Sequence, residues 1–196
     1  MQMSVRVVTR STNSCFIRRM SSFQNGLKPY FEIERNEMNV TALSDANSFK
    51  GDLLVVPCYE DDSKNKLLDG LDFAQTINDV VSEKAFTGKA NSSYVIRSNS
   101  IHPHAKHIAL IGMGKSAANT LSTMSKLGHD IAKLSDKLNS GSVGVVFPDQ
   151  VEDKGKSEGE YIKQLLLGFN DGSYVDNRYR KVPDDGFKTF PVKTFT

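Results

Sequence analysis

Two runs of consecutive apolar residues constrain the fold of this 196-residue chain more than any other feature. Residues 53–56 read Leu-Leu-Val-Val, and residues 106–112 read Lys-His-Ile-Ala-Leu-Ile-Gly. A strand without apolar–polar alternation suits the centre of a sheet whose two faces are both covered. We therefore predict that both runs are central strands and that Pro57 limits how far the first one extends.

Stretches with helical spacing lie between and after these runs. Apolar residues recur every three or four positions over 67–85, 121–138 and 158–169, and the turn sequence at 170–172 is expected to stop the third helix. Shorter strands are predicted at 30–35, 37–43, 94–97 and 143–147, with 94–97 joined to the second central strand by a His-rich loop. This order predicts an α/β fold, one sheet flanked by helices.

The two ends of the chain differ in composition from its body. Residues 1–28 contain no acid and are rich in Ser, Thr and Arg, which is typical of a mitochondrial or plastid presequence. Because Arg outnumbers Lys there, we predict a removable mitochondrial targeting segment and a location on the matrix side; the alternative is a disordered tail. Residues 182–196 contain few apolar side chains and are predicted to be a tail or linker, which leaves one domain at 30–181.

Charge and hydropathy exclude several classes of protein. The formal net charge is +2, but five of the 25 bases precede Glu32 and all 23 acids lie at or after it. The body is therefore mildly acidic, which argues against a nucleic-acid binder that neutralises phosphates. No apolar run reaches the roughly 20 residues that span a bilayer. Two cysteines, Cys15 and Cys58, indicate a reducing compartment rather than a disulfide framework.

The most suggestive local motif is Gly112-Met-Gly114-Lys115-Ser116-Ala117. It follows a predicted strand and opens a predicted helix, where free N–H groups can hold phosphate. A dinucleotide fingerprint would need an acid about 20 residues later, whereas the nearest suitably placed one is Asp149. A P-loop would need a glycine at Ala109. Gly112, Gly114 and Lys115 are therefore candidate residues of a nucleotide-binding alternative only, beside the simpler interpretation of a tight strand-to-helix turn.

A second group with possible chemistry is the histidines. His102, His104 and His107 cluster before the second central strand, and three imidazoles can bind a metal. Pro103 disrupts regular pairing, and no Cys or carboxylate lies within a few positions to complete a tetrahedral site. His129 is expected on a helix surface. We assign no metal ligand.

The acids after the first central strand form a third group. Glu60, Asp61 and Asp62 lie at the sheet edge where ligands of open α/β folds gather. Partner residues of an acid–base site are missing, so a solvated loop is the favoured interpretation. Cys58 has no identifiable base partner and is expected to be buried and inert. We therefore predict no catalytic residue and no cofactor.

Taken in order, these segments resemble the amino-terminal domain of the leucyl aminopeptidase family, a macro-domain-like α/β module. The resemblance rests on GDLLVVPCYE at 51–60, AFTGK at 85–89, HIALIGMGKSA at 107–117, and LLG at 166–168 with NRYRK at 177–181. It covers about residues 37–181 and implies a single mixed sheet flanked by helices.

The resemblance also limits the activity. Family members hydrolyse amino-terminal residues with two metal ions held in a carboxy-terminal domain, in motifs resembling Asn-Thr-Asp-x-Glu-Gly-Arg, and no such motif occurs here. We expect a non-catalytic domain acting through protein partners in assembly or regulation, as a homo-oligomer or as an accessory subunit of a mitochondrial complex. One alternative is a fragment of a di-metal aminopeptidase. Another is an ADP-ribose-binding module, although the Asn-Ala-Ala-Asn motif of macro domains is not found.

Overall fold

The computed structural model describes residues 38–43, 45–61, 71–83, 85–98, 101–116, 120–147, 157–174 and 190–196. Strands within these ranges form one six-stranded sheet in the order β1-β6-β5-β2-β4-β3. They are β1 Asn39–Val40, β2 Gly51–Tyr59, β3 Ser93–Arg97, β4 Ala105–Gly114, β5 Ser142–Val145 and β6 Thr194–Phe195. The described helices are the short 3-10 turn η1 Ala46–Ser48 and α1 Ala74–Ser82, α2 Leu121–Leu138 and α3 Glu158–Ser173. The strand predicted at 30–35 lies outside the described residues.

The sheet is mixed. Strand β2 pairs in parallel with β4 on one side and with β5 on the other, and β6 and β1 continue the parallel set beyond β5. Strand β3 pairs antiparallel with β4, with Val95 opposite Ala109. The predicted neighbourhood of 94–97 and 106–112 is therefore confirmed as a hairpin.

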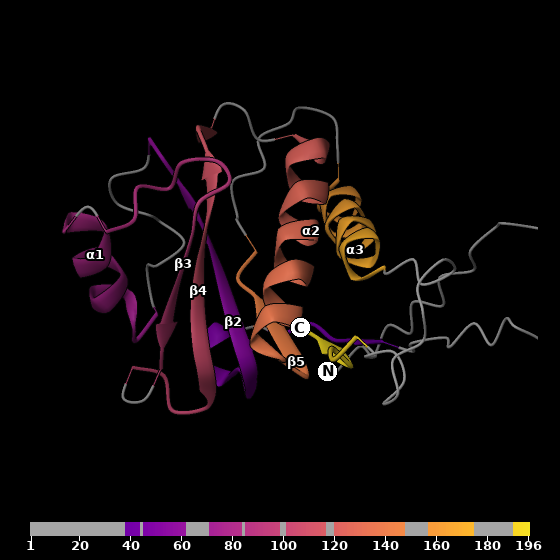
Figure 1. Ribbon diagram of the computed structural model, residues 1–196, viewed down its shortest axis with the longest axis horizontal. Coiled ribbons are helices and arrows are strands. Elements are labelled where there is room, and N and C mark those ends of the chain that lie inside the picture. The colour runs from indigo at the N-terminus through magenta and orange to yellow at the C-terminus, as the bar shows by residue number, and fades with distance from the viewer. Residues whose placement is uncertain are drawn as a thin grey trace, which may run out of the picture.

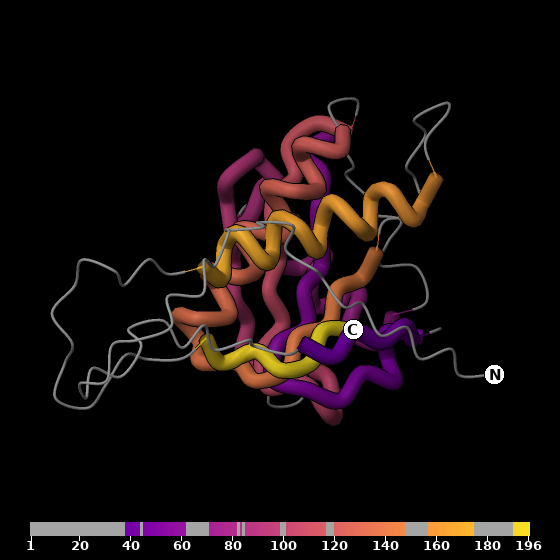
Figure 2. Tube along the Cα trace, turned by 90° about the vertical axis from the view of Figure 1, so that its right-hand side faces the viewer, coloured from indigo at the N-terminus to yellow at the C-terminus, as the bar shows by residue number. Residues whose placement is uncertain are grey.

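Helices cover both faces of the sheet (Figure 1). Helix α1 packs on one face, where Ile77 joins Leu54 and Val56 of β2 in a buried cluster. Helices α2 and α3 cover the other face, where Leu53 and Val55 are buried among their side chains. In Figure 2, which looks onto this second face, α3 crosses in front as the outermost layer. The alternating residues of β2 thus supply two separate cores.

Strand β2 is longer than predicted. It is buried from Leu53 to Tyr59 and runs through Pro57, which was expected to limit it. The ladder with β5 ends at Val55, so the missing N–H of Pro57 does not interrupt that ladder. Pairing with β4 continues to Tyr59.

Helix α2 begins and ends as the apolar spacing predicts. The Thr120 hydroxyl accepts from the N–H of Thr123, and the Thr123 side chain accepts from the N–H of Thr120, a capping box. Asn139 adopts a left-handed conformation at φ 53° and ends the helix. Among the described helices, none combines the length and apolarity that a membrane crossing requires.

Three other helix boundaries differ from the prediction. Helix α1 begins at Ala74, so Leu71 is not helical. Helix α1 ends at Ser82, and the chain then turns to bury Phe86, so Ala85 is not helical. Helix α3 continues past Asn170 and Asp171 to Ser173. Gly172 does not stop α3 because it serves packing: a Cβ there would lie 2.7 Å from the carbonyl oxygen of His129 in α2.

The end of the chain is not a free tail. Residues 194–195 form β6 between β1 and β5, and the yellow end of the chain lies beside the indigo β1 segment in Figure 2. Val192 and Phe195 are buried, and the Phe195 ring meets Phe169 of α3 edge-on at 4.9 Å. The tail prediction for 182–196 was wrong for residues 190–196, because a few apolar side chains suffice to fix a two-residue strand on an existing sheet.

Glycines bring α2 and α3 into backbone contact. A Cβ on Gly128 would lie 2.0 Å from the carbonyl oxygen of Leu165, and a Cβ on Gly168 would lie 1.8 Å from that of Ser125. Both distances are far below any real carbon–oxygen contact, and the obstacle is backbone that cannot rotate away. These two glycines therefore set how closely α3 approaches α2.

The Gly168→Ala variant should lose about 3 kcal/mol of unfolding free energy, because the added methyl forces the helices apart. Gly159→Ala is the matched control in the same helix, since the nearest atom to a Cβ there is 3.9 Å away. The control should be neutral or gain up to about 1 kcal/mol from helix propensity. Urea denaturation measures both, and equal stabilities would contradict the close contact.

The Asp52 carboxylate joins the amino-terminal ends of three strands. Its Oδ2 accepts from the N–H groups of Gly141 and Ser142 at 2.8 and 3.1 Å, and Lys106 of β4 forms an ion pair with Oδ1. Burial alone would raise the pKa of Asp52, but the Lys106 ammonium and the two N–H donors outweigh it and lower that pKa.

The lowered pKa fixes the sign of a pH effect. Asp52 contributes stability that is present above its unfolded pKa of about 3.9 and is lost as the pH falls through its lower folded pKa. Between roughly pH 5 and pH 2 the wild-type chain should therefore lose more unfolding free energy than Asp52→Asn. Urea titrations at several pH values measure this difference, and parallel losses would show that the carboxylate does not stabilise these strands.

Candidate functional site

The carboxyl ends of β2 and β4 meet at one edge of the sheet, where open α/β folds place their ligands. Tyr59 pairs with Gly114, and the N–H of Glu60 donates to the Gly114 carbonyl oxygen at 2.8 Å. This edge therefore brings together the acids after β2 and the glycine motif of β4, two of the groups predicted from the sequence.

Asp61 and Ser116 form a clamp across this edge. The Ser116 N–H donates to Asp61 Oδ1 at 2.9 Å, and the Ser116 hydroxyl donates to Oδ2 at 2.8 Å. The N–H and hydroxyl of Ser116 lower the pKa of Asp61. Both carboxylate oxygens are thus engaged within the chain. Glu60 is exposed, and Asp62 lies outside the described residues.

The loop that precedes β3 packs against the glycines of β4 and accepts hydrogen bonds from them. The N–H of Gly112 donates to Ser92 O at 2.8 Å, and the N–H of Gly114 donates to Gly88 O at 3.0 Å. A Cβ on Gly112 would lie 2.0 Å from the carbonyl oxygen of Lys89. Gly88 and Gly114 have φ of +68° and +78°, which glycine adopts without strain. Packing of this loop explains the glycines without a ligand.

This geometry argues against the nucleotide alternative at Gly112, Gly114 and Lys115. A phosphate site needs free N–H groups, and those of Gly112, Gly114 and Ser116 all donate within the chain. The motif also does not lead directly into α2, which begins at Leu121 with its own cap. The strand continues to Gly114 instead.

His102 is a core residue. It is 4% exposed, and its Nδ1 accepts from the N–H groups of His104 and Ala105 at 3.2 and 3.0 Å. Because Nδ1 accepts, the proton of the neutral ring is on Nε2, which lies 3.4 Å from Ala46 O. His102 thus fixes the loop before β4.

The other predicted side chains do not join it in a site. His104 and His129 are exposed, and His107 Nδ1 is buried with no partner among the described residues. No set of three or more His, Cys, Asp or Glu side chains placed to hold a metal occurs in the described part of the chain. Cys58 is buried, and its Sγ donates to Val56 O at 3.6 Å.

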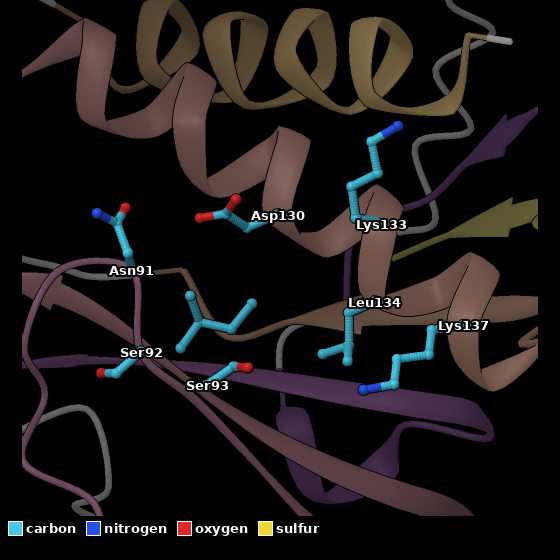
Figure 3. A pocket seen from close by; sticks show the side chains of 8 residues that line it. Asn91, Ser92, Ser93, Asp130, Lys133, Leu134 and Lys137 are labelled. Carbon is cyan, nitrogen blue, oxygen red and sulfur yellow. The ribbon is translucent and has the colours of Figure 1, made fainter.

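A cavity that the sequence did not indicate lies between the turn before β3 and helix α2. It has a volume of about 260 Å³ and is lined by Asn91, Ser92, Ser93, Ile111, Asp130, Lys133, Leu134 and Lys137 (Figure 3). The sequence could have indicated one wall of the cavity, because positions 130, 133, 134 and 137 have the spacing of one side of a helix. The opposite wall comes from residues about 40 positions earlier, so only the fold reveals the pairing.

The amino-acid sequence is similar to that of known proteins. Residues 55–183 match the N-terminal domain of the cytosol aminopeptidase family. The chain is 32% identical over 138 residues to a probable cytosol aminopeptidase of Trichormus variabilis and 24% identical over 175 residues to leucine aminopeptidase 2, chloroplastic, of Oryza sativa subsp. japonica. It spans 27% and 29% of the lengths of these relatives.

Two solved structures share the fold. A mutant of tomato leucine aminopeptidase superposes with a TM-score of 0.62 at 24% identity, covering 81% of this chain and 32% of that one. The macrodomain of Mycobacterium tuberculosis DarG superposes with a TM-score of 0.51 at 15% identity, covering 81% of this chain and 97% of the macrodomain. The predicted macro-domain-like α/β fold is thereby confirmed.

The clamp can be tested by titration. In Ser116→Ala the pKa of Asp61 should rise toward its usual value, although the backbone N–H still donates, because the hydroxyl donor is lost. NMR titration of the carboxyl carbon measures this pKa. Ser122→Ala, an exposed serine of α2, is the control and should leave Asp61 unchanged. An unaltered pKa in Ser116→Ala would mean that the hydroxyl does not contact the carboxylate.

Proposed function

The chain belongs to the cytosol aminopeptidase family and contains the N-terminal domain of that family, and from this premise we propose that it is a non-catalytic module that assembles with, or regulates, an aminopeptidase catalytic module. The module acts through protein contacts rather than through chemistry of its own. Its partner class is inferred from relatives named leucine aminopeptidase and cytosol aminopeptidase.

The observation that carries this proposal is the closed sheet edge. Among the described residues, the N–H groups of Gly112, Gly114 and Ser116 at this edge all donate to the 88–92 loop or to Asp61. Because the described donors at this edge are engaged within the chain, we propose that the domain acts through its surface.

Helix α3 supplies a surface that suits such contacts. It is the outermost layer of its face in Figure 2. Leu167 is 41% exposed and Tyr174 is 65% exposed. Leu167 lies within α3, and Tyr174 is the residue that caps its carboxyl end, seven positions later. We propose that this surface of α3 contacts the catalytic module.

The second candidate is that the domain operates within a longer aminopeptidase polypeptide. The share of the relatives that the chain spans, 27% to 29%, favours this alternative. In both cases the domain has the same role and the catalytic module is the same class of partner. We also propose the mitochondrial matrix as the location, on the composition of residues 1–28 alone.

Co-purification with an activity assay tests the proposal. The tagged full chain is recovered from mitochondria of its own source, and hydrolysis of leucine p-nitroanilide is measured in the eluate and in the chain purified alone. We expect hydrolysis in the eluate and none from the chain alone. Leu167→Glu with Tyr174→Glu should reduce the co-purified activity at least tenfold, because charges are buried at the contact.

Tyr94→Glu is the matched control, because it places the same charge on an exposed aromatic residue of edge strand β3. It should retain the co-purified activity. Hydrolysis by the chain alone would contradict the non-catalytic role. An eluate without aminopeptidase activity would contradict the proposed partner.

A further inference from the structure

Strand β3 forms one edge of the sheet. It pairs with β4 and, within the described residues, with no other strand. Edge strands are usually protected from further pairing by a bulge, by proline or by charged residues, especially lysine. The sequence of β3, Ser-Tyr-Val-Ile-Arg, contains no proline or lysine, its register with β4 is continuous, and its three central residues favour strands. Apart from the charge of Arg97 at its end, this edge lacks those protections.

The hydrogen bonds to β4 show which backbone groups of β3 face outward. The N–H of Ser98 donates to Lys106 O at 3.0 Å, and the N–H of Gly112 donates to Ser92 O at 2.8 Å. Because the backbone groups of successive residues alternate in direction along an antiparallel strand, the even-numbered residues of β3 face β4. The residues whose N–H and C=O groups face away from β4 are Ser93, Val95 and Arg97.

These outward groups are open to a further strand. No described residue forms a hydrogen bond with the backbone of Ser93, Val95 or Arg97 on that side. The side chains of Ser93 and Arg97 are exposed, and Tyr94 is 37% exposed. An added strand therefore gains main-chain hydrogen bonds from three residues of β3.

The edge is complementary to itself. When a second β3 lies antiparallel with Val95 opposite Val95, Ser93 of each copy lies opposite Arg97 of the other. All three outward residues then form hydrogen-bonded pairs, and Tyr94 of each copy lies opposite Ile96 of the other. A register shifted by two residues loses one of the three pairs. A register centred on Arg97 places two like charges opposite each other, which is destabilising.

Both faces of the joined edges match in character. Val95 packs with the core cluster under α2 and α3, and Ile96 packs with the cluster under α1. In the register centred on Val95, the two Val95 side chains meet on the first face, and two Tyr94–Ile96 pairs form on the second. Aromatic and β-branched residues that lie opposite each other are favourable cross-strand pairs. The apolar layers of the two copies therefore become continuous.

Charge also favours a second copy. Arg97 of the second copy, opposite Ser93, lies beside the cavity that Ser93 and Asp130 line, and its chain continues toward Asn91. In Figure 3 the Asp130 carboxylate points toward Asn91, and no described residue donates a hydrogen bond to it. The two lysines of the lining follow three and seven residues later on α2, and the nearer one points toward α3. Each Arg97 thus approaches the acidic end of the cavity.

We propose that the chain pairs with a second copy of itself through β3, around a two-fold axis at Val95, so that the two sheets join into one. A two-fold contact uses the same edge on both copies, so association stops at a dimer. This inference does not depend on the aminopeptidase partner proposed above, because that contact was assigned to α3 and not to β3.

Sedimentation velocity of the purified full chain measures the association. Because a contact of one five-residue strand per copy is small, we expect a dissociation constant in the micromolar range, and the chain is followed from about 1 to 500 µM. A monomer–dimer equilibrium is the expected result.

Charges at one cross-strand pair test the register. Ser93→Arg places like charges opposite each other twice and should weaken the dimer at least tenfold. Adding Arg97→Glu to that variant should restore association, because each new arginine then meets a new glutamate. Positions 93 and 97 of one chain are about 13 Å apart along the strand, so this rescue requires contact between copies.

A backbone variant and a control complete the set. Ser93→Pro removes an outward N–H but leaves the hydrogen bonds to β4, and it should also weaken the dimer at least tenfold. Asn170→Arg adds the same charge as Ser93→Arg on exposed α3 and should leave association unchanged. Circular dichroism melts check that each variant is folded; if Ser93→Pro does not fold, the charge variants decide.

Three outcomes would overturn the proposal. They are a chain that stays monomeric up to about 500 µM, a dimer that Ser93→Arg does not weaken, and a failure of the added Arg97→Glu to restore it. A monomeric chain that still co-purifies aminopeptidase activity would contradict the β3 dimer and leave the proposed function intact.

Discussion

Burial of β2 on both faces is the constraint on which the rest of the structure depends. Seven consecutive residues, Leu53–Tyr59, are buried. Successive side chains of a strand point to opposite faces, so each face of β2 needs its own cover. Helix α1 supplies one, and the α2–α3 pair supplies the other. Neither layer could be removed without exposing half of the central strand to water.

The same constraint explains which parts could be predicted from the sequence. The apolar runs of β2 and β4 and the spacing of α2 are local patterns, strong enough to define their elements without the rest of the chain. The extension of β2 through Pro57 and of α3 through Gly172 was missed, because both residues usually end an element. In this structure the neighbouring elements allow both to continue. Strand β2 continues because its pairing with β5 stops before Pro57, and α3 continues because Gly172 packs against α2. Strand β6 was missed because it exists only where β1 and β5 leave a place for it.

The candidate site was predicted in part for a related reason. The sequence places Asp61 and Gly114 after strands, so their meeting at one edge follows from parallel pairing. The filling of that edge by Ser116 and by the 88–92 loop does not follow, because it depends on side-chain and loop conformation. The likeness to a macrodomain at a TM-score of 0.51 concerns the fold. Two proteins with the same fold share a ligand site at this edge of the sheet only when the N–H groups there are free to bind the ligand.

Three carboxylates show how the chain distributes its hydrogen-bond donors. Asp52 has Lys106 and two N–H groups, and Asp61 has both donors of Ser116, so the pKa of each is lowered. Asp130 has no such donors among the described residues, and burial raises its pKa. A partly buried carboxylate without a hydrogen-bond donor contributes little to the free energy of folding. The direction of each pKa shift thus follows the donors that the described residues bring to the carboxylate, and not burial alone.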